Sequence, residues 1–221
     1  MAALKQSGVQ WIGEMPEHWD ITRAGQHLSQ VKCKNDGLQE KNLLSLSYGK
    51  VKRRDINSSD GLLPESFEGY NIIEENDIVL RFTDLQNDHT SFRVGRATER
   101  GIITSAYTTV RPTDARDSQF LYYALHAYDL RKGFYGMGSG VRQGLKWQEA
   151  KYIQLPWPPR GERAAIVEYL DINCDSIDRA LFAASGKVDV VIQSKHSIAD
   201  SLKAYKQSLI YEVVTGKREV Q

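Results

Sequence analysis

The chain has 221 residues, a formal net charge of +1, 41% hydrophobic residues and 26% charged residues. These values are those of an ordinary folded protein and exclude an intrinsically disordered chain. The small net charge also excludes a uniformly basic protein, so any surface for nucleic acid must be local.

The sequence contains no visible export or membrane signal. No stretch approaches the roughly 18 apolar residues of a transmembrane helix, and the N-terminal MAALKQSG lacks the apolar core of a signal peptide. Cys33 and Cys174 lie far apart and form no CxxC motif, which is typical of reduced thiols. We therefore expect a cytoplasmic protein.

The first two-thirds of the chain predict a compact, mainly β-structured region. In the aromatic-rich residues 9–19, Gly13 and Pro16 argue against a helix, and Trp11 and Trp19 are expected to anchor the segment to the core. Apolar, β-branched and aromatic runs then predict short strands separated by turns, at residues 43–48, 77–83 and 102–110.

A helix is predicted to begin at Asp117 or Ser118 and to run through Leu130. A glycine-rich stretch follows at residues 133–140. Because prolines cannot continue a helix or a central strand, the proline-rich residues 156–159 predict a rigid exit from the domain. Helix returns at about residue 161.

The last fifth of the chain carries apolar residues at alternating spacings of three and four, close to the heptad pattern of a helix that packs along another helix. From Ser176 onward this predicts a helix of about 55 Å, with a break allowed at residues 171–175 or 185–186. The rest of the chain is too small to bury so long an apolar seam. A second copy of the chain is therefore the expected partner. The residues expected at this pairing and docking surface are Ile177, Leu181, Val188, Val191, Ile198, Leu202, Tyr205 and Leu209.

Three segments resemble the specificity (S) subunits of type I restriction-modification systems. They are SGVQWIGEMPEHW at residues 7–19, IQLPWPP at 153–159 with Glu162 and 166–170, and SLIYEVVTGK at 208–217. The three occur in the family's order and cover both ends and the middle of the chain. Arg163 departs from the family pattern, in which many members have Gln.

This resemblance implies an α+β protein with a β-rich target-recognition domain at residues 1–158. A long, coiled-coil-like helical conserved region follows at 159–221. It also implies a non-catalytic subunit without cofactor or metal, which recognises double-stranded DNA for a methyltransferase subunit and a restriction/translocase subunit. A complete S subunit holds two such domains and two helical regions, whereas this chain has one of each. Two copies paired through their helices would then read a bipartite, palindromic site, one half-site per chain.

A DNA-reading surface needs cations for phosphates and polar groups for base edges. Three local clusters qualify: a basic run after a predicted strand, arginines beside Gly95, and polar residues in and after the glycine-rich stretch. The expected DNA-binding residues are Lys50, Lys52, Arg53, Arg54, Arg93, Arg96, Ser139, Arg142, Gln143 and Lys146. Tyr48, Tyr70 and Tyr107 are candidates for contacting or stacking on bases, but a core role is the more natural one for each.

The sequence gives little support for an enzymatic function. Asp114 with Glu149 and Lys151 imitates a metal-dependent nuclease only loosely, and the sequence lacks both motifs of a DNA methyltransferase, the cofactor loop and the Asn/Asp-Pro-Pro-aromatic motif. The five histidines have no metal-ligand spacing. Two alternatives stay open: a coiled-coil interaction protein without a DNA role, and a fragment of a full-length S subunit.

Overall fold

The computed structural model describes residues 3–55, 64, 66–85, 92–137, 144–185 and 192–220, with the backbone alone at 182–185 and 192–197. The chain divides into two compact units. Unit 1 comprises residues 1–21 and 156–221, and unit 2 comprises residues 22–155. Each crossing between the units lies within a strand, β3 (Asp20–Arg23) or β12 (Gln154–Trp157).

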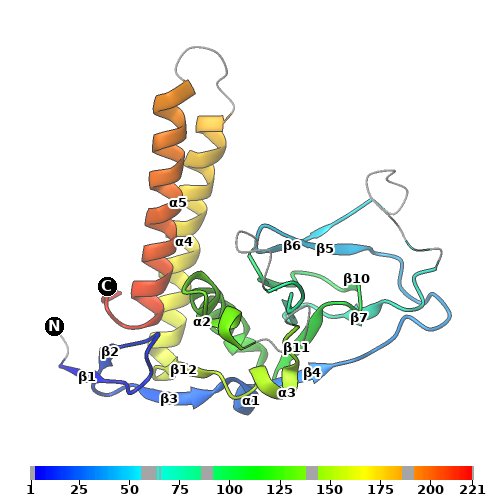
Figure 1. Ribbon diagram of the computed structural model, residues 1–221, viewed down its shortest axis with the longest axis horizontal. Helices are drawn as coiled ribbons and strands as arrows, with labels where there is room; N and C mark the ends of the chain where they lie inside the picture. The colour runs from blue at the N-terminus through cyan, green and yellow to red at the C-terminus, as the bar shows by residue number, and fades with distance from the viewer. Residues whose placement is uncertain are drawn as a thin grey trace. The chain divides into compact units, whose positions relative to one another are not determined.

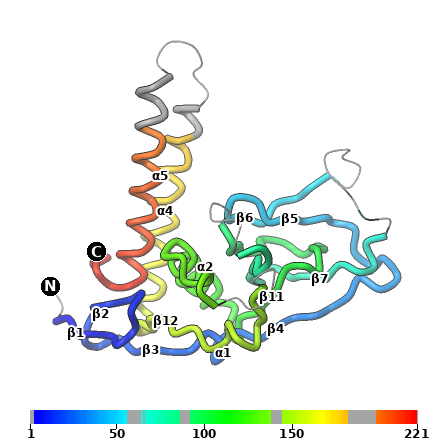
Figure 2. Tube along the Cα trace, viewed as in Figure 1, coloured from blue at the N-terminus to red at the C-terminus, as the bar shows by residue number. Residues whose placement is uncertain are grey.

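Unit 2 is built mainly of antiparallel strands (Figures 1 and 2). A four-stranded sheet has the order β4-β11-β8-β9, and two further pairs are β7 with β10 and β5 with β6. The strands are β4 (Leu28–Val31), β5 (Leu44–Ser47), β6 (Lys50–Arg53), β7 (Asn71–Ile73), β8 (Ile78–Leu80), β9 (Val94–Arg96), β10 (Gly101–Ile103) and β11 (Thr108–Pro112). The short helices α1 (Ala24–His27) and α3 (Trp147–Ala150) and the longer α2 (Ser118–Leu130) complete the unit.

The centre of unit 2 is strand β8, whose three residues are fully buried. A strand made only of β-branched and leucine side chains can be buried on both faces. Leu121 and Ala124 of α2 are likewise fully buried. The helix predicted to run to Leu130 is confirmed. The predicted strands 43–48 and 77–83 contain β5 and β8, and the predicted strand 102–110 covers parts of β10 and β11.

A buried carboxylate links two strands of the sheet. Asp77, which is fully buried, accepts from Arg111 Nε at 2.7 Å and from Nη2 at 2.8 Å, and its Oδ2 also accepts from the Glu74 backbone N–H. The hydrogen bonds to Asp77 raise the pKa of Arg111 above its ordinary value. The pair holds the start of β8 against β11.

Unit 1 contains the β1–β2 hairpin (Leu4–Gln6 and Glu14–Pro16) and two long helices, α4 (Arg160–Ser185) and α5 (Ile192–Val214). The helices run antiparallel and side by side (Figure 1). Among the described helices, none combines the length and apolarity that a membrane-spanning segment requires. The mixed strand and helix architecture expected from the sequence, with a long C-terminal helical region, is confirmed.

The continuous 55 Å helix predicted from Ser176 onward is wrong, because α4 ends at Ser185, one of the two places where the sequence allows a break. α5 lies antiparallel along α4. The heptad seam is therefore covered at least in part by the chain itself and does not require a second copy.

The first 21 residues belong to the same unit as the helices, whereas we expected them in the recognition domain. The C-terminal boundary expected at residue 158 lies close to the division at residues 155 and 156. The physical reason for the N-terminal difference lies in contacts between residues 11–19 and the two helices, described below.

Candidate nucleic-acid interface

The β5–β6 hairpin carries the basic run predicted to bind DNA. Its register pairs Ser47 with Lys50 and Ser45 with Lys52, and it pairs Leu46 with Val51. Because directly opposed residues of an antiparallel pair point to the same side, the hairpin has two distinct faces. One face carries serine and lysine side chains, and the other carries leucine and valine.

The apolar face of the hairpin is packed into the core of unit 2. Leu44 and Val51 belong to a buried cluster with Ile73, Val79 and Ile103, and Leu46 packs against it. The opposite face is left to solvent: Lys50 and Lys52 are exposed, and Ser45 and Ser47 are partly exposed.

Two glycines of unit 2 let the hairpin approach its neighbours closely. A Cβ at Gly95 of β9 would lie 2.4 Å from Leu46 Cδ1, and one at Gly101 of β10 would lie 2.5 Å from the Asn42 carbonyl oxygen. Such distances are far below van der Waals contact, so any larger residue would push the hairpin away. The apolar face of the hairpin therefore packs closely on β9 and β10.

The tip of the hairpin is a two-residue turn at Tyr48 and Gly49, with φ values of +49° and +75°. Two successive positive φ values in a two-residue turn correspond to type I′, which favours Asn-Gly. Tyr48 is 87% exposed, so the core role expected for it is wrong. The Gly49 carbonyl accepts from the Tyr122 hydroxyl at 3.3 Å, which ties the tip to α2.

Arg53 has a different environment from the two lysines. It shares the register position of Leu44, and its guanidinium donates to both carboxylate oxygens of Glu99. These hydrogen bonds raise the pKa of Arg53 and lower that of Glu99. Arg53 therefore holds the end of β6 to the chain before β10, while its side chain remains 74% exposed.

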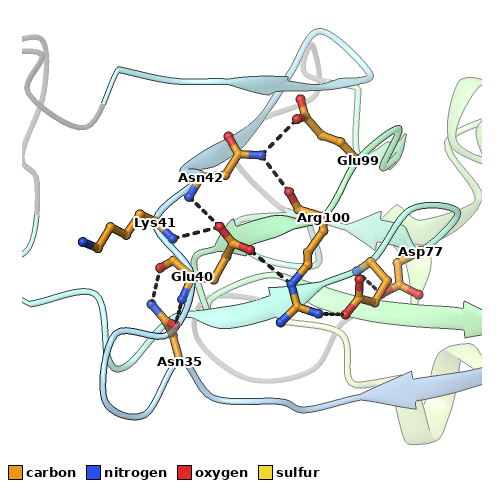
Figure 3. A network of polar contacts seen from close by, with 8 residues as sticks. Asn35, Glu40, Lys41, Asn42, Asp77, Glu99 and Arg100 are labelled. Carbon is orange, nitrogen blue, oxygen red and sulfur yellow. Dashed lines mark hydrogen bonds and ion pairs between the residues drawn. The ribbon is translucent and has the colours of Figure 1, made fainter.

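Glu99 belongs to a larger polar network (Figure 3). Asn42 Nδ2 donates to Glu99 Oε2 at 3.0 Å and to the Arg100 carbonyl at 2.7 Å. Glu40 accepts from the backbone N–H groups of Asn42 and Lys41, at 2.9 and 2.8 Å, and from Arg100 Nε at 3.1 Å. These contacts, the Asn42 N–H foremost, hold the pKa of Glu40 below its ordinary value. The network orders the segment that leads into β5.

Arg93, predicted to contact DNA, is fully buried, and this prediction is wrong. Its guanidinium donates to the carbonyls of Arg81, Thr83 and Asp84, at 3.2, 2.7 and 3.0 Å, and to the Tyr135 hydroxyl at 3.1 Å. An arginine can satisfy its five N–H donors with backbone carbonyls, which lowers the cost of burying it. Its role is to order residues 81–84.

The other predicted DNA-binding residues have varied surroundings. Arg96 Nη1 donates to Asn76 Oδ1 at 2.6 Å, and Arg54 is partly exposed. Lys146 is exposed at the start of α3, where its backbone N–H donates to Glu149. Ser139, Arg142 and Gln143 lie outside the described residues.

The residues predicted for pairing and docking separate into four groups. Ile177 and Leu209 are buried, at 8% and 1% exposure, so neither is available to a second chain, and their assignment to the pairing surface is corrected. Leu181 and Leu202 are partly buried, whereas Ile198 and Tyr205 are 55% and 48% exposed. Val188 and Val191 lie outside the described residues.

A second polar site joins three distant parts of unit 1. Trp19 Nε1 donates to Glu162 Oε2 at 2.8 Å, and His18 Nε2 lies 2.7 Å from Glu162 Oε1. At the other end of the chain, the Tyr211 hydroxyl donates to the Trp11 carbonyl at 3.0 Å. A cavity of about 280 Å³ is bordered by Trp19, Glu162 and the C-terminal tail. Both Glu162 oxygens are engaged, so this carboxylate fixes the N-terminal segment to α4.

Gly216 completes the same junction. It has φ +74°, and a Cβ there would lie 2.3 Å from Pro16 Cδ and 3.0 Å from the Trp19 ring. Only glycine fits both the conformation and the space. The expectation that the N-terminal tryptophans act as anchors agrees with these contacts.

Among the described residues, no three His, Cys, Asp or Glu side chains gather so as to hold a metal ion. Sequence reasoning missed Ser45 and Ser47 as site residues. The alternation of serine with leucine at residues 43–47, read together with the lysines at 50 and 52 across a two-residue turn, could have found them.

No family model and no curated protein matches the sequence. Among solved structures, the chain is similar to the S subunit of a type I restriction-modification system from M. genitalium, at 16% identity and TM-score 0.49, over 76% of this chain and 41% of that one. It is also similar to the HsdS subunit from Thermoanaerobacter tengcongensis, at 14% identity and TM-score 0.48, over 97% and 48%.

A third similar chain comes from a structure describing assembly and conformational transition of the type I R-M system, at 14% identity and TM-score 0.49, over 92% of this chain and 47% of that one. The aligned part is thus less than half of each of the three proteins. They belong to the systems whose specificity subunits the three sequence segments resemble.

Proposed function

We propose that this chain is a sequence-specific DNA-recognition subunit of a type I restriction-modification complex. In this role unit 2 reads double-stranded DNA, and unit 1 connects the reader to its partners. The chain itself supplies no catalysis, which belongs to a methyltransferase subunit and a restriction/translocase subunit. It acts with them in the cytoplasm.

One observation carries the proposal. The residues that resemble S subunits are far apart in the sequence, yet they contact one another in unit 1. Trp19 from the first segment donates to Glu162 from the second, and Tyr211 from the third donates to Trp11 from the first. The glycine of the third segment is required by its packing on Pro16 and Trp19. Three chance resemblances would have no reason to form one junction.

Unit 2 supplies the chemistry that DNA recognition needs. Residues 44–53 hold three cationic side chains and no acidic one, and two of the three, Lys50 and Lys52, lie on the exposed face of the hairpin. A local basic face of this kind binds the phosphate backbone even where the whole chain is close to neutral.

For the partners, we propose that unit 1 docks the methyltransferase subunit and a second copy of the chain. Ile172 of α4 and Ile198 and Tyr205 of α5 are large apolar side chains that are 61%, 55% and 48% exposed. They are candidates for such contacts, whereas Ile177 and Leu209 are not. With one reader per chain, two paired chains would recognise two identical inverted half-sites at a fixed spacing.

The test is selection of bound duplexes from a library with 20 random base pairs, using the full chain alone and mixed with its cognate methyltransferase subunit. Two identical inverted motifs at one spacing would support both DNA recognition and pairing. One motif beside an unrelated one would support recognition within an asymmetric subunit and reject pairing. No enrichment with either preparation would reject the proposal and favour an interaction protein without a DNA role.

A further inference from the structure

We propose that the β5–β6 hairpin is the element of this chain that enters the major groove of duplex DNA, with Ser45, Ser47 and Tyr48 as its specificity-determining residues. The inference rests on the proposed function and adds which element reads the bases. It does not follow from the basic run alone, because neither serine is part of that run and the sequence favoured a core role over base contact for Tyr48.

The first argument is the shape of the element. A two-stranded antiparallel ribbon fits the major groove of B-DNA, which is about 12 Å wide. Each strand of this ribbon has four residues and spans about 13 Å. Its apolar face is buried on the cluster of Leu44 and Val51, so only the face with Ser45, Ser47, Lys50 and Lys52 can meet a ligand.

The second argument is the chemistry of that face. Register places each serine opposite a lysine, so a row of hydroxyl groups on β5 lies beside a row of ammonium groups on β6. Hydroxyl groups donate to and accept from base edges, and lysine ammonium groups bind phosphates or guanine O6 and N7. The described residues of the ribbon include no carboxylate that would repel a phosphate.

The third argument is Tyr48. It adopts φ +49° at a position that favours asparagine, and it exposes 87% of its surface. Neither its conformation nor its packing explains a tyrosine there, because an aromatic ring gains nothing for folding when it faces water. An aromatic ring beside lysines can contact a thymine methyl group in the major groove, while the lysines bind phosphates.

The fourth argument is rigidity. The close approaches at Gly95 and Gly101, and the hydrogen bond from Tyr122 to the Gly49 carbonyl, hold the ribbon at its base and at its tip. A reader that is already ordered loses less conformational entropy when it binds. The ribbon thus has the preorganisation expected of a specificity element.

Tyr48→Asn is the central test variant. It removes the ring but places the favoured Asn-Gly pair in the turn, so its melting temperature should equal or exceed that of the wild type. Tyr48→Phe keeps the ring. Tyr152→Asn is the matched control, because Tyr152 is also an exposed tyrosine of unit 2, at 57%. Affinity is measured by fluorescence anisotropy, on the duplex that the wild type enriches and on the unselected pool.

We expect Tyr48→Asn to bind the enriched duplex at least tenfold more weakly, and Tyr48→Phe and Tyr152→Asn to stay within about twofold of the wild type. Ser45→Ala/Ser47→Ala should keep its affinity for the pool but lose about fivefold or more in preference for the enriched duplex. Lys50→Ala/Lys52→Ala should weaken binding to both and lower the slope of log affinity against log salt by about 2.

Two results would overturn the inference, and they are distinguishable. If the wild type enriches a motif and all ribbon variants bind it within twofold of the wild type, the ribbon is not the reader, although the proposed function stands. If the wild type neither enriches a motif nor binds the pool, the proposed function fails and the inference fails with it.

Discussion

Lys206 Nζ lies 2.6 Å from Asp178 Oδ1, and this ion pair fixes how α5 lies along α4. Both side chains are largely shielded from solvent, at 22% and 30% exposure. Asp178 directly follows the buried Ile177 in α4, and Lys206 precedes the buried Leu209 by three residues in α5. Apolar burial and a charge pair therefore specify the same antiparallel register within one chain.

Replacing a buried seam residue should destabilise unit 1 itself. Leu209→Ala should lower the free energy of unfolding by about 2–5 kcal/mol, because Leu209 is 1% exposed and its loss leaves a cavity. Ile198→Ala, at a seam position that is 55% exposed, should change it by about 0.5 kcal/mol or less. Urea unfolding followed by circular dichroism measures both. Equal effects of the two substitutions would contradict the packing described for the helices.

Arg93 and Lys52 were both predicted to contact DNA, but their substitutions should have opposite effects on stability and on DNA affinity. Arg93→Ala should cost about 3 kcal/mol or more of stability, because it leaves the carbonyls of residues 81–84 without their donor. Lys52→Ala should leave the melting temperature unchanged and reduce DNA affinity. A stable Arg93→Ala protein with weakened DNA binding would show that Arg93 acts on DNA after all.

Stability should depend on the charge of Glu40. Its pKa is lowered in the folded protein, so its contribution is complete at neutral pH. That contribution is lost as the pH falls below the ordinary value of 4.5 and through the lower folded value. Glu40→Gln should therefore melt below the wild type at pH 7, and the gap should close towards pH 3. Glu17→Gln, at an exposed glutamate, serves as the control. A gap that does not change with pH would refute the assignment.

The two cysteines should differ sharply in reactivity. Burial raises the pKa of Cys174 to about 11, so at pH 8 only about one molecule in a thousand carries the thiolate, whereas Cys33 is exposed. Ellman's reagent should label one thiol in the folded wild type and none in Cys33→Ser. Full labelling of Cys33→Ser before unfolding would show that Cys174 is accessible.

The local elements were predictable because their signals are local. Alternation in residues 43–47 defines β5, and the apolar period after Ser118 defines α2. The heptad pattern of the C-terminal region was also real. It specifies that a helix packs on another helix but not whether that helix comes from the same chain. The antiparallel packing of α4 and α5 shows that the partner helix comes from the same chain, which the pattern alone could not predict.

The candidate site was only partly predictable, because burial depends on contacts between distant residues. Arg93 and Lys50 are equally charged in the sequence, yet three backbone carbonyls surround the first and the second faces solvent. Tyr48 differs from its prediction in the opposite direction. Its aromatic ring predicts burial, but its position in the turn with Gly49 exposes it to solvent. The pairing register across the two-residue turn brings Ser45 and Ser47 beside the lysines, so finding them requires the alternation and the turn to be read together.

The central claim, that this chain reads a DNA sequence, is tested most directly by comparing two affinities at 0.15 M salt, about the physiological ionic strength. The full chain, in the preparation that gave enrichment, is titrated against the enriched duplex and against a scrambled duplex of the same composition. We predict tighter binding to the enriched duplex by about a thousandfold or more, the range typical of specific recognition. Equal affinity for the two duplexes would contradict the account.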